Sequence, residues 1–173
     1  MILSDEKLLE LITAGYLPGD VHLGPCSVDL TLAEDYLVPD PPEDVPYMTI
    51  HAEFPHRLAP VASTILYPQK FVLASTNELI KIPAHMAGVI HGRSSVGRLG
   101  IQVQNAGFID AGFSGQITLE LVNQSNMPIV LNPHMRICQL VIHQLHGQAQ
   151  RPYQGKYQGQ VGPTPSRIRD DAE

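Results

Sequence analysis

Residues 116–123 read QITLELVN, and this stretch decides the fold because polar and apolar side chains alternate along it. Successive side chains of an extended chain point to opposite faces, so Leu119 and Leu121 share one face and Glu120 lies between them on the other. A period of two is typical of a half-buried β-strand. We therefore predict a strand here, with a carboxylate at the middle of its less apolar face.

Short runs of the same kind, bounded by glycine, proline or asparagine, recur on both sides of this stretch. Many short strands separated by turn residues are typical of a β-sandwich or barrel of the jelly-roll kind. The proline-rich segment 40–60 is instead expected to form an extended loop. Further strands are predicted at 28–32, 61–67, 70–75, 86–91, 100–104, 128–131 and 136–145.

One helix is predicted, near the N-terminus at residues 4–14. Ser4 is of the type that caps a first turn, and Gly15 is of the type that ends a last turn. Leu8 and Leu9 contribute to an apolar face, so we expect the helix to pack on the rest of the domain.

Length and charge limit the classes of protein to consider. The chain has 173 residues, 43% of them hydrophobic, and 11 basic against 17 acidic side chains, which gives a net charge of −6. We expect a single domain at 1–173, no nucleic-acid partner because no basic stripe is present, and no membrane partner because no apolar run approaches about 20 residues. The N-terminus lacks a signal peptide's basic start, so we expect a cytoplasmic protein. Cys26 and Cys138 are expected to be reduced and mostly buried.

Residues 92–98 read GRSSVGR and could form a cradle for an oxyanion. Glycines let backbone N–H groups approach a ligand, serine hydroxyls donate hydrogen bonds, and arginine forks match the geometry of phosphate. The same residues could equally form a polar turn with solvated arginines.

Two carboxylates near the centre of the chain have a structural and a functional interpretation each. Asp110 lies in the glycine-rich run NAGFIDAGFSG at 105–115, where it is either the former of an Asx-turn or a ligand contact. Glu120 is either solvated on an open face or held in a pocket with a raised pKa, as a general acid and base requires.

Residues 51–53 read HAE, which matches the H-x-E of zinc-dependent deaminases. That chemistry also requires a P-C-x-x-C motif downstream of the histidine. Here Pro25 and Cys26 precede the histidine, and Cys138 stands alone. We therefore expect no catalytic zinc.

Six segments, taken in order, resemble the dCTP deaminase family of the dUTPase-like superfamily. The resemblance implies a mainly β fold, a distorted jelly-roll or β-barrel of the dUTPase-like type, with one N-terminal helix and a flexible C-terminal lid at about 148–173. It also implies a homotrimer with active sites at the subunit interfaces. The segments are MILSD at 1–5, GPCSVDLTL at 24–32, HGRSSVGRLG at 91–100, AGFIDAGFSGQITLELVN at 106–123, RICQLV at 136–141 and PYQGKYQGQVGPTPSR at 152–167.

The resemblance further implies how the substrate dCTP is bound and hydrolysed. Glu120 matches the catalytic glutamate that activates water for attack on C4, with Ser94, Arg98 and Asp110 in support. Asp110 would also hold the 3′-hydroxyl of the deoxyribose. The full set of implied substrate contacts is Arg93, Ser94, Ser95, Val96, Gly97, Arg98, Asp110, Thr118, Leu119, Glu120, Gln139, Tyr153, Lys156 and Gln160.

Mg²⁺ is the cofactor that the resemblance implies, bound through the triphosphate with Asp29 as a contact through water. No metal is expected at the reacting carbon. Besides dCTP, the resemblance implies dUTP as a second ligand and dTTP as an inhibitor.

Ala106 and Gly107 bear on whether the reaction stops at dUTP. Family members that continue to dUMP and pyrophosphate tend to carry Ala-Gly at this point, whereas members that stop carry a histidine in place of the glycine. We therefore predict the two-step reaction, which supplies dUMP for thymidylate synthesis, and expect the small residue to leave room for the second water. The alternatives are a deaminase that releases dUTP, a plain dUTPase, and a nucleotide sensor without activity.

Overall fold

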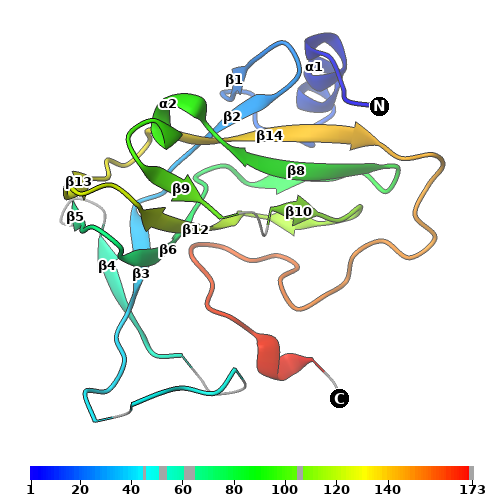
Figure 1. Cartoon of the computed structure of the whole chain (residues 1–173). Helices are drawn as coiled ribbons and strands as arrows, with labels where there is room; N and C mark the ends of the chain where they lie inside the picture. The colour runs from blue at the N-terminus through cyan, green and yellow to red at the C-terminus, as the bar shows by residue number, and fades with distance from the viewer. Residues whose placement is uncertain (45, 51–53, 61–64, 105–106, 172–173) are drawn as a thin grey trace.

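The structure is a computed structural model that describes residues 1–44, 46–50, 54–60, 65–104 and 107–171 (Figure 1). Two five-stranded antiparallel sheets and two short ribbons make up the fold. The first sheet has the order β1 (His22–Leu23), β2 (Val28–Thr31), β14 (Arg136–Gln144), β8 (Met86–Gly92) and β10 (Phe108–Ile109). The second has the order β4 (His56–Pro60), β3 (Asp35–Pro39), β6 (Phe71–Ser75), β12 (Thr118–Asn123) and β9 (Ile101–Val103).

The ribbons pair β11 (Ser114–Gly115) with β7 (Ile80–Lys81) and β13 (Ile129–Val130) with β5 (Ile65–Leu66). The expected mainly β fold is therefore confirmed. The pairings between described residues leave two open sheets, so they form the sandwich variant of a jelly-roll rather than a closed barrel.

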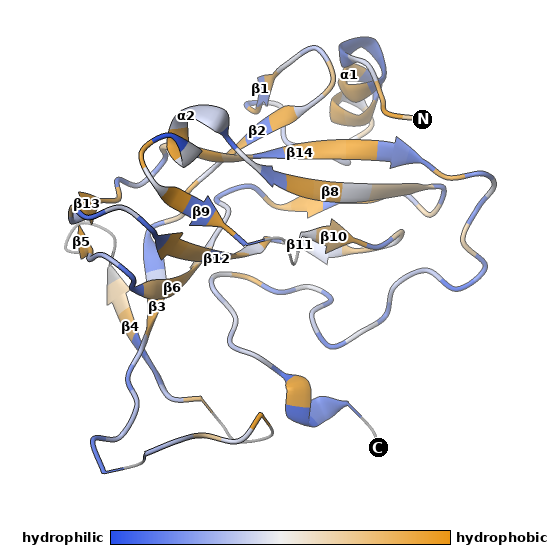
Figure 2. Cartoon of the chain, in the orientation of Figure 1, coloured by the Kyte–Doolittle hydropathy of each residue, from blue (hydrophilic) through white to orange (hydrophobic). Residues whose placement is uncertain are grey.

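One apolar core joins the two sheets. Leu140 of β14 and Leu121 of β12 are fully buried in the same cluster, although they belong to different sheets. Burial of each such side chain stabilises the fold by about 1.5–3 kcal/mol. Apolar residues concentrate in the strands, whereas the segment after β14 is mostly hydrophilic (Figure 2).

The predicted helix is present as α1 (Asp5–Thr13). Leu8 and Leu11 are buried, but Leu9 is 55% exposed, so its placement on the packed face was wrong. Residues three apart share a helix face more closely than adjacent residues do, which is why Leu11 replaces Leu9. Gly15 ends the helix as predicted, with a φ of +75°.

Ser4 stands at the N-cap position without a capping bond from its side chain, which corrects the prediction that it caps the helix. The backbone N–H of Asp5 instead donates to the carbonyl of Pro25 at 2.9 Å. The helix terminus is thus satisfied by the loop before β2, and this contact fixes α1 to the first sheet.

Seven predicted strands are confirmed to within two residues at each end, namely β2, β6, β8, β9, β12, β13 and β14. Of the strand predicted at 61–67, Ile65–Leu66 is present as β5, and 61–64 lie outside the described residues. The extended loop predicted at 40–60 is wrong at its end, because 56–60 form β4 and pair with the unpredicted β3. An edge strand such as β4 tolerates proline, since one of its sides needs no ladder hydrogen bonds.

The two thiols differ in exposure. Cys138 is buried, and this burial raises the pKa of its thiol well above the ordinary value. Cys26 is exposed in the turn before β2, so the expectation that both are mostly buried was wrong for Cys26. Within the described parts of the chain, no helix is long and apolar enough to cross a bilayer.

Candidate active site

A cavity of about 860 Å³ lies against the second sheet, and Glu120 lines it. Glu120 sits at the middle of β12, opposite Leu73 of β6, on the face away from the buried Leu119 and Leu121. This face is half-buried rather than open to solvent, because Phe71, Leu73 and Phe113 also line the cavity. The alternation along β12 therefore directs one carboxylate into an apolar hollow.

The surroundings of Glu120 change its acidity. Burial removes water from the carboxylate and raises the pKa of Glu120 above its ordinary value, against a smaller opposing effect of a hydrogen bond with its own backbone. A carboxyl group with a raised pKa accepts and returns a proton closer to neutral pH, as general acid–base catalysis requires. Of the two interpretations of Glu120, the structure favours the pocket.

Asp110 is exposed at the rim of the same cavity. Its backbone carbonyl accepts the N–H of Phe113 at 3.2 Å, which makes the turn that follows β10. This turn is closed by the backbone and not by the carboxylate, as an Asx-turn would be, so it leaves the ligand contact of Asp110 a prediction. Thr118 lines the cavity from β12. Leu119 does not line it and its side chain is buried in the core, so a contact of Leu119 with the substrate would have to come from its backbone.

The C-terminal tail, residues 148–171, runs back along 111–118 and covers the cavity (Figure 1). Its backbone bonds join Tyr153 to Ala111 at 2.8 Å and Gly159 to Ser114 at 2.8 Å. Tyr153 and Gln160 both line the cavity, as expected for substrate contacts. This is the position of a lid, whereas its flexibility stays a prediction.

Two glycines let the tail approach so closely. A Cβ at Gly112, where φ is +91°, would lie 2.6 Å from Cβ of Pro152, and a Cβ at Gly115 would lie 2.9 Å from the carbonyl oxygen of Gln160. The side chain of Gln160 donates to the carbonyl of Gln116 at 2.8 Å. Its own oxygen is buried and has no partner among the described residues, so it is available to a ligand donor.

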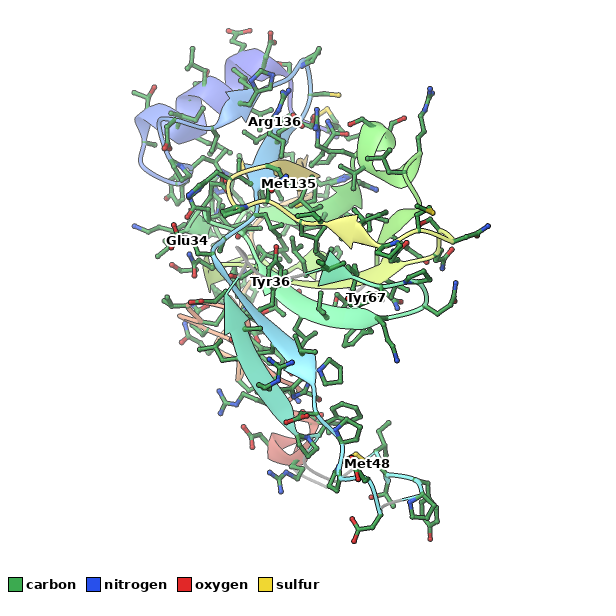
Figure 3. The ribbon with its side chains drawn as sticks, turned by 90° about the vertical axis from the view of Figure 1, so that its left-hand side faces the viewer. Glu34, Tyr36, Met48, Tyr67, Met135 and Arg136 are labelled. Atoms are coloured by element: carbon green, nitrogen blue, oxygen red, sulfur yellow. The ribbon has the colours of Figure 1, made fainter. Side chains whose placement is uncertain are left out.

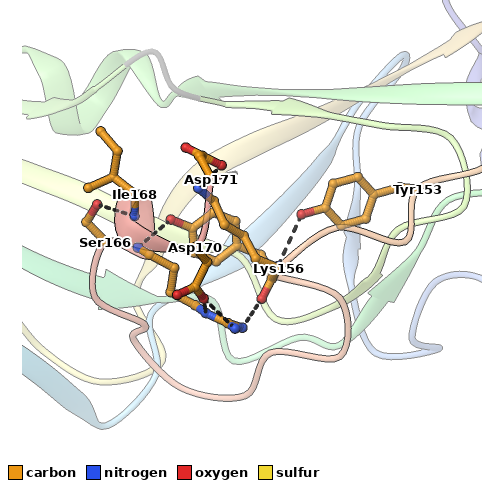
Figure 4. Close-up of polar contacts among 8 residues, drawn as sticks. Tyr153, Lys156, Ser166, Ile168, Asp170 and Asp171 are labelled. Atoms are coloured by element: carbon orange, nitrogen blue, oxygen red, sulfur yellow. Dashed lines mark hydrogen bonds and ion pairs between the residues drawn. The ribbon is translucent and has the colours of Figure 1, made fainter. Parts of the chain in front are cut away.

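Lys156 lines neither cavity, although the resemblance implies a substrate contact. Its ammonium pairs with Asp171 at 2.6 Å and lies 5.7 Å from the ring centroid of Tyr157 (Figure 4). Tyr153, which does line the cavity, accepts the N–H of Tyr157 through its hydroxyl at 3.1 Å. Tyr153 therefore links the cavity wall to the polar contacts at the end of the tail, whereas Lys156 takes part in those contacts but stays outside the cavity.

A second cavity, of about 370 Å³, lies where the sequence predicted an anion cradle. The segment turns as the short helix α2 (Ser94–Gly97), with the N–H groups of Val96 and Gly97 bonded to the carbonyl of Arg93 at 3.0 and 2.9 Å. Val96 is buried, and neither it nor Gly97 lines the cavity. The lining residues are Arg93, Ser94, Ser95, Arg98 and Gln139, all of them predicted.

The two cavities share no residue. Figure 3 shows Arg136, which lies behind the cradle, toward one end of the molecule and Met48, which lines the Glu120 cavity, at the other end. The predicted site residues that line a cavity therefore fall into two groups, one in the cradle around Arg93 and Arg98 and one around Glu120. Sequence order gave no sign of this separation, because Arg98 and Glu120 are close along the chain.

Sequence reasoning missed Arg136, which does not line the cradle but shares Asp29 with Gln139, which does. Its guanidinium donates to the carboxylate of Asp29 at 3.1 Å, and Gln139 donates to the same carboxylate at 3.0 Å. In a regular strand these two residues would point to opposite faces, since they are three apart. A register shift between Arg136 and Cys138 adds the residue that brings them to one side.

Gly107 lines the Glu120 cavity. A Cβ there would lie 2.9 Å from both Cβ and the carbonyl oxygen of Ile90, so close packing on β8 is a second reason for glycine at this position. That a small residue leaves room for the second water stays a prediction. Ala106 lies outside the described residues.

The described residues contain no group of three or more His, Cys, Asp or Glu side chains that could hold a metal ion. The HAE segment at 51–53 lies outside them. Chemically, the described residues can bind an anion at one place and transfer a proton at another.

Comparisons with known proteins show the family of the chain. A family model described as dCTP deaminase-like matches residues 2–145. The chain belongs to the dCTP deaminase-like family, as the six sequence segments predicted.

A protein of Persephonella marina (strain DSM 14350 / EX-H1) named "dCTP deaminase, dUMP-forming" is 44% identical over an alignment of 177 residues that covers 97% of this chain and 97% of that one. A protein of Mycolicibacterium paratuberculosis with the same name is 45% identical over 185 residues, covering 96% of this chain and 95% of that one. The crystal structure of 2′-deoxycytidine 5′-triphosphate deaminase from Agrobacterium tumefaciens is similar with a TM-score of 0.65 and 23% identity, covering 82% of this chain and 47% of that chain. This last likeness shows the fold.

Proposed function

We propose that the chain converts dCTP to dUMP in two hydrolytic steps. The first adds water at C4 of cytosine and releases ammonia, which gives dUTP. The second adds water at the α-phosphorus and releases pyrophosphate. The names of the relatives from P. marina and M. paratuberculosis support this substrate and product. The observation that carries the chemistry is Glu120, half-buried in an apolar cavity with a raised pKa.

Glu120 would act first as a base and then as an acid. Its carboxylate takes a proton from the water that attacks C4 and passes this proton to N3. It then takes the proton of the new C4 hydroxyl and passes it to the departing ammonia, which leaves the carbonyl at C4. The apolar wall and the tail exclude other water, which strengthens the electrostatic interactions inside. The burden of activating water falls on Glu120, so stoichiometric zinc in the purified protein would contradict this mechanism.

Asp110 is the candidate for the second step. It lies on the rim of the cavity next to Gly107 and is exposed, so its carboxylate is free to hold the 3′-hydroxyl and to orient water. Close packing of Gly107 on Ile90 keeps this loop against β8. We infer that this packing contributes to the two-step reaction that Ala106-Gly107 predicts.

Mg²⁺ would be held by the phosphate oxygens of the nucleotide and would neutralise their charge. The expected contact of Asp29 with this ion through water fits the structure poorly. The side chain of Asp29 is 7% exposed and already meets Arg93, Arg136 and Gln139. The proton transfers assigned to Glu120 do not involve this ion.

The separation of the two cavities supports a homotrimer with shared sites. In one chain the residues that bind phosphate and the residue that moves protons line different cavities. A nucleotide needs both, so we propose that the cradle of one subunit completes the Glu120 cavity of its neighbour. A cytoplasmic location and inhibition by dTTP stay predictions.

Product analysis tests the function. Purified protein is mixed with dCTP and Mg²⁺, and the nucleotides are separated by ion-exchange chromatography. We expect dUMP and pyrophosphate without accumulation of dUTP. A reaction that stops at dUTP would keep the role of Glu120 and refute the two-step proposal. Absence of turnover with intact binding would make the chain a nucleotide sensor, and turnover of dUTP alone would make it a plain dUTPase.

Mixed trimers test the shared site. Glu120→Gln and Arg98→Ala subunits, each with little activity alone at a low dCTP concentration, are unfolded together and refolded. Random assembly then restores about a quarter of the wild-type activity, since one interface in four pairs an intact cradle with an intact glutamate. Activity no higher than that of the separate variants would place the whole site within one subunit.

A further inference from the structure

A buried carboxylate lies directly behind the cradle. Asp29 of β2 has a side chain that is only 7% exposed. Its Oδ2 atom lies 3.2 Å from Nε of Arg93 and 3.1 Å from Nη1 of Arg136, and its Oδ1 atom accepts the amide of Gln139 at 3.0 Å. Three side chains from two separate parts of the sequence therefore meet on one carboxylate.

The first sheet brings these residues together. β14 lies between β2 and β8, so Gln139 pairs with Asp29 on one side and with His91 on the other. Arg93 follows the end of β8, and the register shift in β14 turns Arg136 toward the same carboxylate. Arg93 also donates from Nη1 to the backbone carbonyl of Arg136 at 3.3 Å.

The negative charge of Asp29 makes this cluster less favourable for binding an anion than its arginines alone would be. Two guanidinium groups face one carboxylate, which leaves a net charge of about +1, and Arg98 in the same cavity adds one more. Without Asp29 the site would be more positive. A negative charge behind an anion site lowers its affinity by charge alone, so its value must lie elsewhere.

We propose that Asp29 is a positioning residue of the anion site, and that Arg136 is the counter-charge that lets it be buried there. Asp29 fixes one edge of the Arg93 guanidinium and the amide of Gln139, so that the remaining donors of both point as one set at the cavity. Arg136 offsets the cost of burying the carboxylate. The proposal deepens the proposed function, on which it rests for the identity of the nucleotide but not for the binding of an oxyanion.

Asp29→Asn tests this role by the sign of its effect. The substitution makes the cluster more positive by one charge, so charge alone predicts tighter binding of an anion. A magnesium contact predicts no change when metal is absent. Positioning predicts weaker binding, because the amide of asparagine cannot hold two guanidinium groups. The measurement is calorimetric titration of the full chain with inorganic tripolyphosphate in the presence of a chelator.

We expect the affinity of Asp29→Asn for tripolyphosphate to fall at least about tenfold. Equal or tighter binding overturns the proposal, and so does a wild-type chain that binds no tripolyphosphate. Glu10→Gln is the matched control, because it also removes one negative charge, from an exposed ion pair with Lys7 on α1. Its affinity is expected to equal that of the wild type.

If circular dichroism shows that Asp29→Asn does not fold, the Arg136→Lys variant is used to test the proposal instead. Arg136 is 40% exposed, and lysine keeps the charge while losing the planar fork. We expect several-fold weaker binding of tripolyphosphate, and unchanged binding overturns the proposal.

Turnover of dCTP separates this proposal from the proposed function. Tripolyphosphate has no base or sugar, so its binding does not depend on Glu120. Weaker tripolyphosphate binding in Asp29→Asn together with no dCTP turnover by the wild type would keep the positioning role and refute the deaminase. In an active enzyme, Asp29→Asn should raise KM for dCTP at least about tenfold and change kcat much less.

Discussion

The Glu120 cavity and the Arg93–Arg98 cradle differ in almost every physical respect. The first is lined mainly by apolar side chains and covered by the tail, whereas the second is smaller and lined only by charged and polar ones. Proton transfer gains from exclusion of water, while an anion is best held by fixed donors near solvent. The comparison shows two different environments prepared by one chain, which the proposed shared site would bring together at a subunit interface.

The largest effect is expected from removing the proton-transferring group. Glu120→Gln should lower deamination by about 10²–10⁴-fold, since glutamine keeps the shape but cannot accept the proton of water. Ammonia release measures this loss. Binding of tripolyphosphate should be unchanged because the cradle is a separate cavity, and a parallel loss of both would break the division into two parts.

Arg98→Ala should produce the opposite pattern. It removes a guanidinium from the cradle, and a desolvated charge pair with phosphate is worth about 2–5 kcal/mol. Titration with tripolyphosphate measures the loss. The pH at which the remaining activity rises should stay where it is in the wild type, because that pH belongs to the Glu120 cavity. A shift in the pH dependence of activity would show that Arg98 affects the ionisation of a group in the Glu120 cavity.

The tail gives a smaller effect, confined to the first cavity. Gly112→Ala places a Cβ against Pro152 in a left-handed backbone conformation, so the tail should detach and KM for dCTP should rise about three- to tenfold. Limited proteolysis within 148–171 measures the detachment. Gly159→Ala is the matched control, because its φ is +75° but nothing lies within 4 Å of its Cβ. Equal proteolysis of both variants would attribute the effect to backbone strain alone.

The smallest effect is on stability. Because burial raises the pKa of Glu120 in the folded chain, ionisation of this group above that pKa favours the unfolded state. The melting temperature of Glu120→Gln at pH 8 should therefore be higher than that of the wild type. The difference should vanish below the ordinary pKa of glutamate, where the carboxyl is neutral in both states. Calorimetric melting at pH 8 and pH 4 measures it, and a difference that persists at pH 4 would indicate packing rather than charge.

Sequence patterns predicted those parts of the molecule in which local periodicity and tertiary packing agree. The alternation of β12 placed Glu120 correctly, and the glycine- and serine-rich run at 92–98 marked the cradle. Local patterns did not predict β3 and β4, because proline residues hide the pattern of an edge strand. They also did not predict that Leu9 is exposed, because the helix has two neighbouring apolar residues, Leu8 and Leu9, and buries only the first.

Other features were invisible because they belong to the assembled sheets. The contact of Arg136 with Asp29 joins residues far apart in the sequence. It depends on the register shift in β14, which no residue type in the strand predicts. The division of the predicted residues between two cavities likewise belongs to the folded chain and not to the spacing of motifs. The roles assigned to individual site residues stay predictions until the variants above are measured.

The irregularity in β14 also constrains how the chain can change in length. Removing one residue at Arg136–Cys138 would restore regular pairing and turn Arg136 away from Asp29. Inserting one before Gln139 would reverse the faces of every later side chain in the strand and expose Leu140 and Ile142, which are now fully buried. Insertions and deletions during evolution are therefore expected to accumulate in the proline-rich segment between β3 and β4, while β14 keeps its residue count unchanged.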